Sequence, residues 1–96
     1  MEKKLFDLGR IVMTKGVGEI VKENLEAYIE VSECLERHQA GDWGEVCEED
    51  KKWNDRCVEV GERVLSCYRI GENKERIWII TEWDRSVTTI FLPEEY

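Results

Sequence analysis

The sequence predicts an α+β domain in which helices pack on one face of a four-stranded sheet. Three observations lead to this prediction. Residues 16–39 show the three-and-four spacing of apolar residues that is typical of amphipathic helix. After residue 62, three β-rich segments follow one another with short polar turns between them, as in an antiparallel meander. A further β-rich segment precedes the helices, so the expected order is one strand, two or three helices and then three strands.

Length and charge narrow the functional classes. The chain has 96 residues and a formal net charge of −8, and residues 1–96 are expected to form one domain. That length allows one core but no large enclosed substrate cavity in addition. The negative charge argues against binding a nucleic-acid backbone or an anionic membrane, and it favours a protein partner with a basic surface. No apolar run approaches the roughly 18 residues of a membrane span, and no signal-peptide pattern is present, so we expect a cytoplasmic protein.

The first strand is expected at Leu5–Thr14, where Gly9 marks a bulge or a close approach of another backbone segment. Thr14 can cap a helix that begins near Gly16. The apolar residues expected to face the core from residues 16–39 are Val17, Val21, Tyr28, Val31 and Leu35. The segment fits one long helix, because no Pro or Gly interrupts residues 19–40. It also fits two helices that meet at Asn24, a poor residue for a helix interior.

A second stripe on the same segment is acidic. It consists of Glu19, Glu23, Glu26, Glu30, Glu33 and Glu36. Like charges four residues apart on a helix repel each other, at a cost of a few tenths of a kcal/mol per pair. A solvated helix face is the simpler interpretation of this stripe. The alternative is a docking surface for a basic protein partner.

Residues 41–61 are expected to form a turn and another helix. Gly41 suits the left-handed position that follows a helix end, and Trp43 is expected to fold inward. The helix is expected from about Cys47 to Val60, with carboxylates in its first turn and Gly61 at its end. The residues expected to face the core are Trp53, Cys57 and Val60.

Three strands complete the expected sheet: Arg63–Ile70, Arg76–Glu82 and Val87–Leu92. They show alternation or are rich in β-branched and aromatic residues, which suits a pleated, half-buried surface. The polar loop at 71–74 and the turn at 83–86 are short enough to make antiparallel hairpins. Pro93 has no N–H to donate and is expected to end the last strand.

The cysteines are Cys34, Cys47, Cys57 and Cys67. None belongs to a closely spaced pair and the chain has one histidine, so the pattern does not favour a zinc site. Disulfides are disfavoured in the cytosol. We therefore expect free thiols that pack as small apolar residues, and we expect neither a metal nor a cofactor.

The candidate catalytic residues are His38, Asp42, Asp50 and Asn54. His38 is the side chain expected to titrate near neutral pH, and a His–Asp pair with Asp42 can activate water or a nucleophile. More often a lone histidine at a helix end caps carbonyls or packs with one nitrogen bonded, and this structural role is the favoured one. No common phosphate-loop, zinc-protease or nucleophile-elbow signature occurs.

The candidate ligand-binding residues are Arg63, Asp84, Arg85 and Thr89. Asp84 and Arg85 could converge with His38, Asp42, Asp50 and Asn54 into a polar cleft for a small ligand or a nucleotide, with Arg63 adding positive charge. The competing interpretation is an Arg–carboxylate clamp that holds the turn at 83–86 against a helix, and it is preferred.

Four segments resemble a known family: HQAGDWG at 38–44, EEDKKWN at 48–54, GERVLSCY at 61–68 and IWIITEWDRSVTTIFLPEEY at 77–96. They are similar to a small family found on bacterial plasmids, prophages and conjugative elements, whose members show RHxxGDWG and a closing LLPEEY. The likeness extends from Gly9 to Tyr96. It departs from the family between Asn24 and Leu35, where members have a break with Gly or Pro, and Phe91 replaces the usual leucine.

Members of that family carry labels such as plasmid-related protein or restriction-modification subunit. A chain of this length has no room for the cofactor-binding domain of a methyltransferase subunit. The resemblance therefore implies a mobile-element setting, and it adds Trp43 to the candidate residues given above.

These features predict a non-enzymatic accessory protein of a mobile element that acts by protein–protein interaction. An inhibitor of a restriction or CRISPR nuclease, docking through the acidic stripe, is the specific form of this prediction. The alternative is a small-ligand or nucleotide binder or hydrolase around His38, Asp42 and Arg85. A third hypothesis is an oligomeric module such as a homodimer, with aromatic residues at the interface. Those residues are Trp43, Trp83 and Tyr96.

Overall fold

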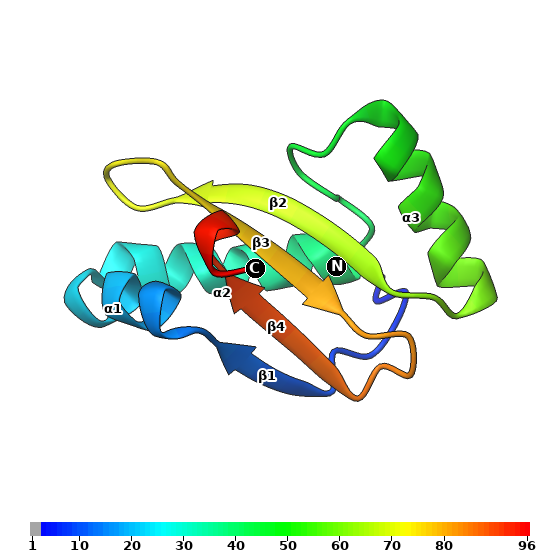
Figure 1. Ribbon diagram of the computed structural model, residues 1–96, viewed down its shortest axis with the longest axis horizontal. Coiled ribbons are helices and arrows are strands. Elements are labelled where there is room, and N and C mark those ends of the chain that lie inside the picture. The colour runs from blue at the N-terminus through cyan, green and yellow to red at the C-terminus, as the bar shows by residue number, and fades with distance from the viewer. Residues whose placement is uncertain (1–2) are drawn as a thin grey trace.

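The computed structural model describes residues 3–96 and is built on a four-stranded sheet in the order β1-β4-β3-β2 (Figure 1). The strands are β1 (Arg10–Met13), β2 (Val64–Ile70), β3 (Glu75–Thr81) and β4 (Val87–Phe91). β2, β3 and β4 form an antiparallel meander, and β1 pairs parallel with β4. The predicted α+β fold, with one strand, then helices, then a three-stranded meander, is confirmed.

The helices are α1 (Lys15–Glu23), α2 (Leu25–Gln39) and α3 (Glu48–Val60), and a 3₁₀ turn, η1 (Pro93–Glu95), follows β4. Residues 16–39 thus form two helices. Asn24 has extended backbone angles, and its side-chain oxygen accepts a hydrogen bond of 3.2 Å from the N–H of Ala27. Asparagine at this position caps α2 and interrupts the helical series, as its preference for helix starts explains.

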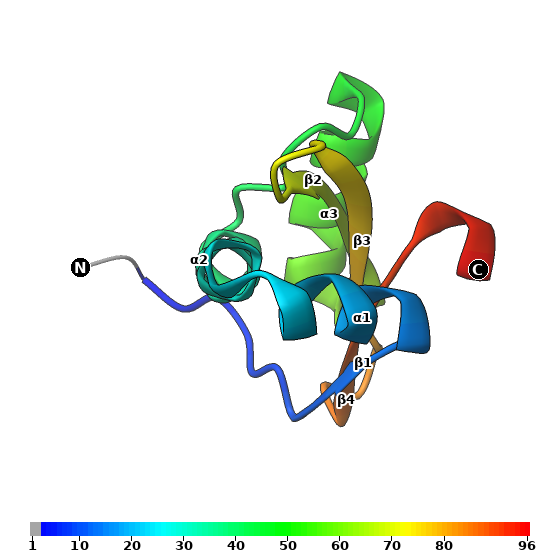
Figure 2. The ribbon, with the colours of Figure 1, turned by 90° about the vertical axis from the view of Figure 1, so that its left-hand side faces the viewer.

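The α-helices leave one face of the sheet uncovered. α2 runs along one face, α1 packs at the end of the sheet where β1 and β4 finish, and α3 lies beside β2 (Figures 1 and 2). No α-helix of residues 3–96 lies over the opposite face, which we call the open face. The main core lies between α1, α2 and the sheet. Its buried members are Val17, Val31, Cys34, Tyr68, Ile70, Ile77, Ile79 and Ile90.

Three apolar residues that we expected in the core are exposed. Tyr28 is 52% exposed, Trp53 64% and Val60 54%. Because a new helix begins after Asn24, the apolar series of α1 does not continue in phase into α2, and Tyr28 turns outward. α3 buries a narrow stripe centred on Asn54 and Cys57, which leaves Trp53 at its margin.

A smaller core lies under α3 and confirms the inward position of Trp43, which is 2% exposed. Trp43 packs with Cys57 and Val64, and its indole N–H donates a hydrogen bond of 2.9 Å to Asp55. Gly61 ends α3, as predicted, and has a left-handed backbone, and the predicted left-handed conformation of Gly41 after α2 is confirmed by its φ of +86°.

β1 is shorter than the predicted strand at Leu5–Thr14, and Leu5 and Phe6 bind the end of α2 instead. The N–H of Leu5 donates to the carbonyl of Gln39, and the side-chain amide of Gln39 donates to the carbonyl of Phe6, both at 2.9 Å. The predicted close approach at Gly9 is confirmed: its φ is +65°, and a Cβ there would overlap the backbone of Arg85 and Ser86.

Glu95 caps α1 from the far end of the chain. Its carboxylate accepts hydrogen bonds from the N–H of Gly16 at 2.9 Å, the N–H of Leu92 at 2.8 Å and the hydroxyl of Thr14. Thr14 occupies the N-cap position of α1, as predicted, but its hydroxyl donates to Glu95 and makes no capping hydrogen bond to the helix. These hydrogen bonds, from Thr14 first, lower the pKa of Glu95, and the positive end of α1 favours its negative charge.

The outer edge of β2 is occupied by polar groups from outside the sheet. The side-chain amide of Asn54 donates to the carbonyl of Leu65 at 2.7 Å and accepts from its N–H at 3.2 Å. Two residues further along β2, the N–H of Cys67 donates to the carbonyl of Trp43, and the carbonyl of Cys67 accepts from the N–H of Glu45. Both outward backbone groups of these two strand residues therefore have partners.

Candidate functional site

The candidate catalytic histidine is sealed in the core. His38 has no exposed surface, and its ring packs edge-on against Phe6 and Trp43. Nδ1 is hydrogen-bonded to the hydroxyl of Ser66, and Nε2 lies 2.9 Å from the hydroxyl of Thr81. A buried side chain with both ring nitrogens occupied cannot reach a substrate in this conformation.

The hydroxyl groups beyond His38 fix the direction of these hydrogen bonds. Thr88 donates to the carbonyl of Leu8 at 2.7 Å, so its oxygen must accept from Thr81, which lies 2.8 Å away. Thr81 then accepts from Nε2–H of His38, and Nδ1 accepts from Ser66. The neutral Nε2–H tautomer is the one that satisfies every group. This chain of hydrogen bonds, which we call the His38 network, links α2 to β2, β3, β4 and the segment before β1.

Burial keeps His38 uncharged at neutral pH. Desolvation, with a smaller contribution from the positive charge of Arg85, lowers the pKa of His38 to about 3. A general base is most effective when its pKa lies near the working pH. The favoured structural role of His38 is thus the one that the geometry supports.

Asp42 does not pair with His38. Its carboxylate accepts hydrogen bonds from Arg37 at 2.7 Å and from the N–H of Gly44 at 3.2 Å, and the first of these holds the pKa of Asp42 below its usual value. Arg37 also lies over the ring of Tyr68, whose hydroxyl donates to the carbonyl of Asp42. Asp42 therefore anchors the turn that follows α2.

The two candidates on α3 have different environments. Asn54 is 4% exposed and has its amide committed to Leu65. Asp50 is exposed in the first turn of α3, where a negative charge suits the helix dipole. Neither residue is hydrogen-bonded to His38 or Asp42, so the structure does not bring the four catalytic candidates together.

Arg85 clamps the β3–β4 turn to the end of α3. Its guanidinium donates to the carbonyls of Glu62 at 2.8 Å, Glu82 at 3.2 Å and Cys57 at 3.3 Å. The clamp itself was predicted, but its partners are backbone carbonyls and not a carboxylate. Cations bind well at a helix C-terminus, because the last carbonyls there lack partners within the helix.

Asp84 belongs to the turn and not to a pocket. Its carboxylate accepts from the N–H of Ser86 at 3.1 Å and from the hydroxyl of the same residue at 2.6 Å. These hydrogen bonds lower the pKa of Asp84 and hold the turn in place. Of the aromatic interface candidates, Trp83 in this turn is 64% exposed and Tyr96 74%, whereas Trp43 is buried.

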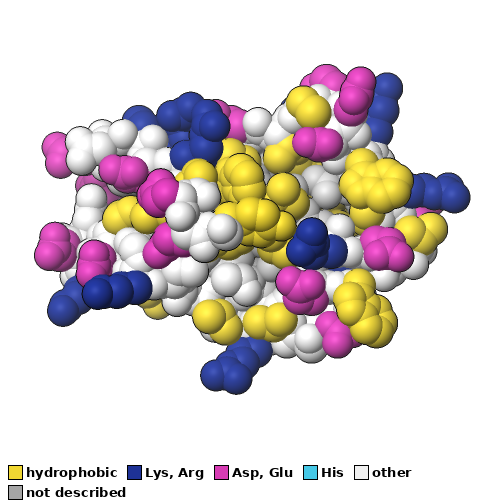
Figure 3. All heavy atoms as spheres, viewed as in Figure 1, with side chains coloured by type: hydrophobic (Ala, Val, Ile, Leu, Met, Phe, Trp, Pro, Cys, Tyr) yellow, Lys and Arg dark blue, Asp and Glu magenta, His cyan; other side chains and the backbone are white. Residues whose placement is uncertain are grey.

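Arg63 and Thr89 do come together, on the open face. They line a hollow of about 230 Å³ whose other walls include Ile80, Phe91 and Tyr96. The ring of Tyr96 stacks on Phe91 with centroids 5.4 Å apart, so η1 folds back over the sheet. Figure 3 shows that hydrophobic side chains gather at the centre of this face, with basic and acidic ones around them.

The acidic stripe is divided between two helices and is partly used by the fold. Glu30 accepts a hydrogen bond of 3.1 Å from the N–H of Gly71. No ion pair in the described part of the chain involves the other five members. They are Glu19 and Glu23 on α1, and Glu26, Glu33 and Glu36 on α2.

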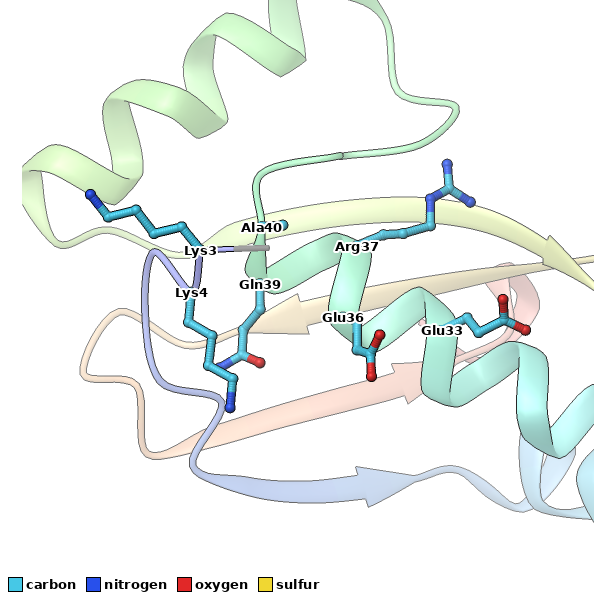
Figure 4. A pocket seen from close by; sticks show the side chains of 7 residues that line it. All are labelled: Lys3, Lys4, Glu33, Glu36, Arg37, Gln39 and Ala40. Atoms are coloured by element: carbon cyan, nitrogen blue, oxygen red, sulfur yellow. The ribbon is translucent and has the colours of Figure 1, made fainter. Parts of the chain in front are cut away.

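Two hollows border the stripe. One, of about 560 Å³, lies at the junction of α1 and α2 and is lined by Glu23, Glu26, Glu30, Glu72 and Lys74, among others. The other, of about 450 Å³, lies at the far end of α2. Figure 4 shows Glu33 and Glu36 projecting from that helix, with Lys3 and Lys4 near its end. The negative charge is therefore strongest at the α1–α2 junction.

Large apolar side chains are exposed on α2 next to the acidic residues. Leu25 is 74% exposed and Ile29 50%, and the two lie one helical turn apart. Ile29 and Glu36 are seven residues apart and share the same side of the helix. That side lies opposite the buried Ala27, Val31, Cys34 and His38. We call Leu25, Tyr28, Ile29, Glu26, Glu33 and Glu36 the outward face of α2.

The thiols show no sign of a metal centre. Among the residues that the structure describes, no three histidine, cysteine or acidic side chains are grouped so that they could hold a metal ion. Cys34, Cys57 and Cys67 are buried free thiols as expected, and burial raises the pKa of Cys34 to about 11. Cys47 is exposed, which the sequence did not predict.

Several residues with structural roles carried no sequence signal. Ser66, Thr81 and Thr88 look like ordinary strand residues, and only their hydrogen bonds around His38 in the folded structure reveal the network.

No helix of residues 3–96 has both the length and the apolar character of a membrane span. The chain matches none of the family models, curated proteins or solved structures with which it was compared. The resemblance to the mobile-element family stays a prediction.

Proposed function

We propose that the protein is a non-enzymatic interaction protein that docks a basic protein partner through the outward face of α2. One observation carries the proposal: Leu25 and Ile29 are exposed on the same side of a helix as unpaired carboxylates. Apolar side chains supply binding energy when a partner covers them, and the carboxylates select a partner of positive charge. Contiguous apolar patches at a protein surface often mark a binding site.

The dispersal of the catalytic candidates supports the non-enzymatic part of the proposal. His38 is sealed, Asn54 closes a strand edge, and Arg85 is committed to three carbonyls. These groups stabilise the fold, so none is left to act on a substrate. The free thiols favour the cytoplasm as the setting.

The resemblance to plasmid and prophage proteins supports a partner in host defence. Restriction and CRISPR nucleases hold nucleic acid in basic grooves, and such grooves have the charge that an acidic docking face requires. In this proposal the protein inhibits a nuclease by occupying part of its nucleic-acid surface. It does not itself bind nucleic acid, because its net charge of −8 opposes contact with phosphates.

The proposal is tested with a panel of purified restriction and CRISPR nucleases, by measuring binding and inhibition of cleavage. A double variant, Leu25→Ser with Ile29→Ser, is expected to weaken binding about tenfold or more, because it removes the apolar anchors. A triple variant with glutamine at Glu26, Glu33 and Glu36 is expected to weaken binding and reduce its salt dependence. Glu30 is left unchanged because the fold uses it.

The control is a triple variant with the same charge change elsewhere, at Glu49, Glu62 and Glu75, all of which are exposed. It should bind as the wild type does. If no nuclease in the panel is bound, the defence-inhibitor proposal is wrong. If a nuclease is bound equally by wild type and both α2 variants, the outward face of α2 is not the docking surface.

A second candidate function, small-ligand binding, is favoured by the hollow at Arg63 and Thr89 on the open face and not by the His38 cluster. Its apolar floor suits a flat ligand such as a nucleobase, and Arg63 offers a guanidinium to the phosphate of a nucleoside monophosphate, although Glu82 and Glu95 in the same lining oppose that charge. Calorimetric titration with nucleoside monophosphates tests it, with Arg63→Ala as the matched variant. Absence of heat in the wild type would exclude this class of ligand.

A further inference from the structure

β1 is an outer strand, and no strand among residues 3–96 pairs with its free edge. The N–H of Arg10 donates to Ser86 at 2.9 Å and the N–H of Thr14 donates to Ile90 at 3.0 Å. In a parallel ladder, the N–H and C=O of one residue point to the same side, and alternate residues point to opposite sides. The backbone groups of Ile11 and Met13 therefore point away from β4, and no strand formed by residues 3–96 pairs with that side.

The side chains at the centre of β1 do not protect this edge, and the one charged residue of the strand, Arg10, stands at its start. Ile11 is 47% exposed and Val12 36%, and the strand contains neither proline nor lysine. Natural proteins usually block an outer strand with such residues, with a bulge or with a covering segment. A free edge with exposed apolar side chains is a template for another strand.

We propose that the β1 edge pairs with the same edge of a second copy of the chain, antiparallel across a two-fold axis. Two four-stranded sheets then form one continuous sheet. The two-fold axis makes the interface closed, so the assembly stops at a dimer. This proposal is independent of the docking face on α2, because β1 and the outward side of α2 are different surfaces (Figures 1 and 2).

The alternation of β1 selects the register. With the axis at Val12, Val12 lies opposite its own copy, and Ile11 lies opposite Met13 of the second copy. Ile11 and Met13 are the residues with outward backbone groups, so each such pair exchanges two hydrogen bonds. Val12 faces its own β4 and so forms the closer, non-hydrogen-bonded pair, in which two exposed valines cover each other.

Charge complementarity favours a second copy as the occupant in this register. Arg10 lies opposite Thr14 of the second copy, whose hydroxyl is bound by Glu95 of that copy. The Arg10 guanidinium can therefore reach the Glu95 carboxylate across the interface, and the two-fold axis makes this contact twice. Two chains of net charge −8 repel each other in general, so a pairing that sets arginine against glutamate is selected over others.

The test combines sedimentation velocity over a concentration series with amide hydrogen exchange. The wild type is expected to form a dimer, and exchange at Ile11 and Met13 should slow as dimer forms. Exchange at Val12, whose N–H faces β4, should be slow in both states. The variant Ile11→Pro removes an outward N–H and leaves the bonds to β4, so it should raise the dimer dissociation constant about tenfold or more.

Two further variants keep the test decisive. Ile11→Lys should weaken the dimer without changing the backbone, in case the proline variant does not fold. Arg10→Glu sets like charges against each other and should weaken the dimer, whereas Lys52→Glu, the same charge change on the exposed surface of α3, should not. A wild type that stays monomeric throughout overturns the proposal. So does a dimer in which Ile11 and Met13 exchange as fast as in the monomer.

Discussion

The two outer strands of the sheet differ in whether their outward backbone groups have hydrogen-bond partners. At the β2 edge, the outward backbone groups of Leu65 bind Asn54, and those of Cys67 bind Trp43 and Glu45. At the β1 edge, nothing in residues 3–96 covers the outward groups of Ile11 and Met13. An edge whose central backbone groups are satisfied is a poor template for another strand, so association is favoured at the β1 edge.

The way in which the β2 edge is closed shows how little chain such protection needs. The amide of Asn54 offers one donor and one acceptor, as a peptide group does, and it binds Leu65 as a neighbouring strand would. The Trp43–Glu45 segment supplies one further bridge, and Arg69 pairs with Glu45 at 3.0 Å beside it. One side chain and one turn thus occupy the outward backbone groups of Leu65 and Cys67, two of the three outward-facing residues of β2.

The largest expected effect comes from reopening the β2 edge at Gly44. This residue has a φ of +74°, and an added Cβ would overlap the carbonyl oxygen of Cys67. Gly44→Ala should therefore break the bridge and lower the free energy of unfolding by about 3 kcal/mol, measured by urea denaturation. Gly18→Ala is the control: a Cβ at Gly18 meets nothing within 4 Å, so that variant should be neutral or slightly more stable.

A Gly44→Ala protein as stable as the wild type would show that the bridge to Cys67 is dispensable. A further readout tests the comparison of the edges directly. If closing the β2 edge is what prevents pairing there, Gly44→Ala should associate at lower concentration than the wild type. Unchanged association would mean that other features protect this edge.

The next effect is expected at Asn54. Asn54→Ala removes both hydrogen bonds to Leu65 and leaves its N–H and C=O without partners, which should cost roughly 2–3 kcal/mol of unfolding free energy. Asp50→Ala, one turn earlier on the exposed side of α3, should change stability by less than about 0.5 kcal/mol. Equal stabilities for the two variants, again from urea denaturation, would contradict the role given to Asn54.

The smallest expected effect concerns the His38 network, which runs from β2 to the segment before β1 and so joins the two sides of the sheet. The pKa of His38 is lowered to about 3, while the unfolded chain binds a proton near its ordinary value. The contribution of neutral His38 to the free energy of unfolding is thus complete above about pH 6.5 and is lost progressively as the pH falls toward 3.

Between pH 7 and 5, the free energy of unfolding should fall by about 2 kcal/mol, at up to about 1.4 kcal/mol per pH unit. His38 is the one histidine of the chain, so few other side chains titrate in this range. The measurement is a set of urea denaturation curves across these pH values. A stability that stays flat from pH 7 to 5 would show that His38 is not held neutral by the fold.

Much of the fold follows from local patterns, whereas the candidate site depends on distant contacts. The strands at 63–92 and α3 were predicted to within two residues, because alternation and turn residues act locally. The sequence does not decide whether residues 16–39 form one helix or two, because asparagine can occupy a helix interior at a modest cost. The packing of the folded chain determines that the helix breaks at Asn24. The core position predicted for Tyr28 is wrong for the same reason, because it continues the apolar spacing of α1 across the break.

The roles of the polar residues were harder to predict than the elements that carry them. The pairing of Asp42 with Arg37 instead of His38 depends on which way each side chain leaves the end of α2. Arg85 is expected to bind a carboxylate, but its guanidinium instead donates to the backbone carbonyls of Cys57 and Glu62 at and just beyond the end of α3. Glu95 and Gly16 are distant in sequence, so no local pattern could connect them.

The parallel pairing of β1 with β4 has a consequence for the order of folding. β2, β3 and β4 are joined by short turns and can form hairpins early. β1 can pair only after β4 has formed, because its first residue, Arg10, is paired with Val87 of β4. Contacts between distant parts of a chain form slowly, because a large loop must close first. Until that step, β4 presents its own bare edge. We therefore expect a folding molecule to be most open to misassembly before β1 docks on β4 and Glu95 binds the start of α1.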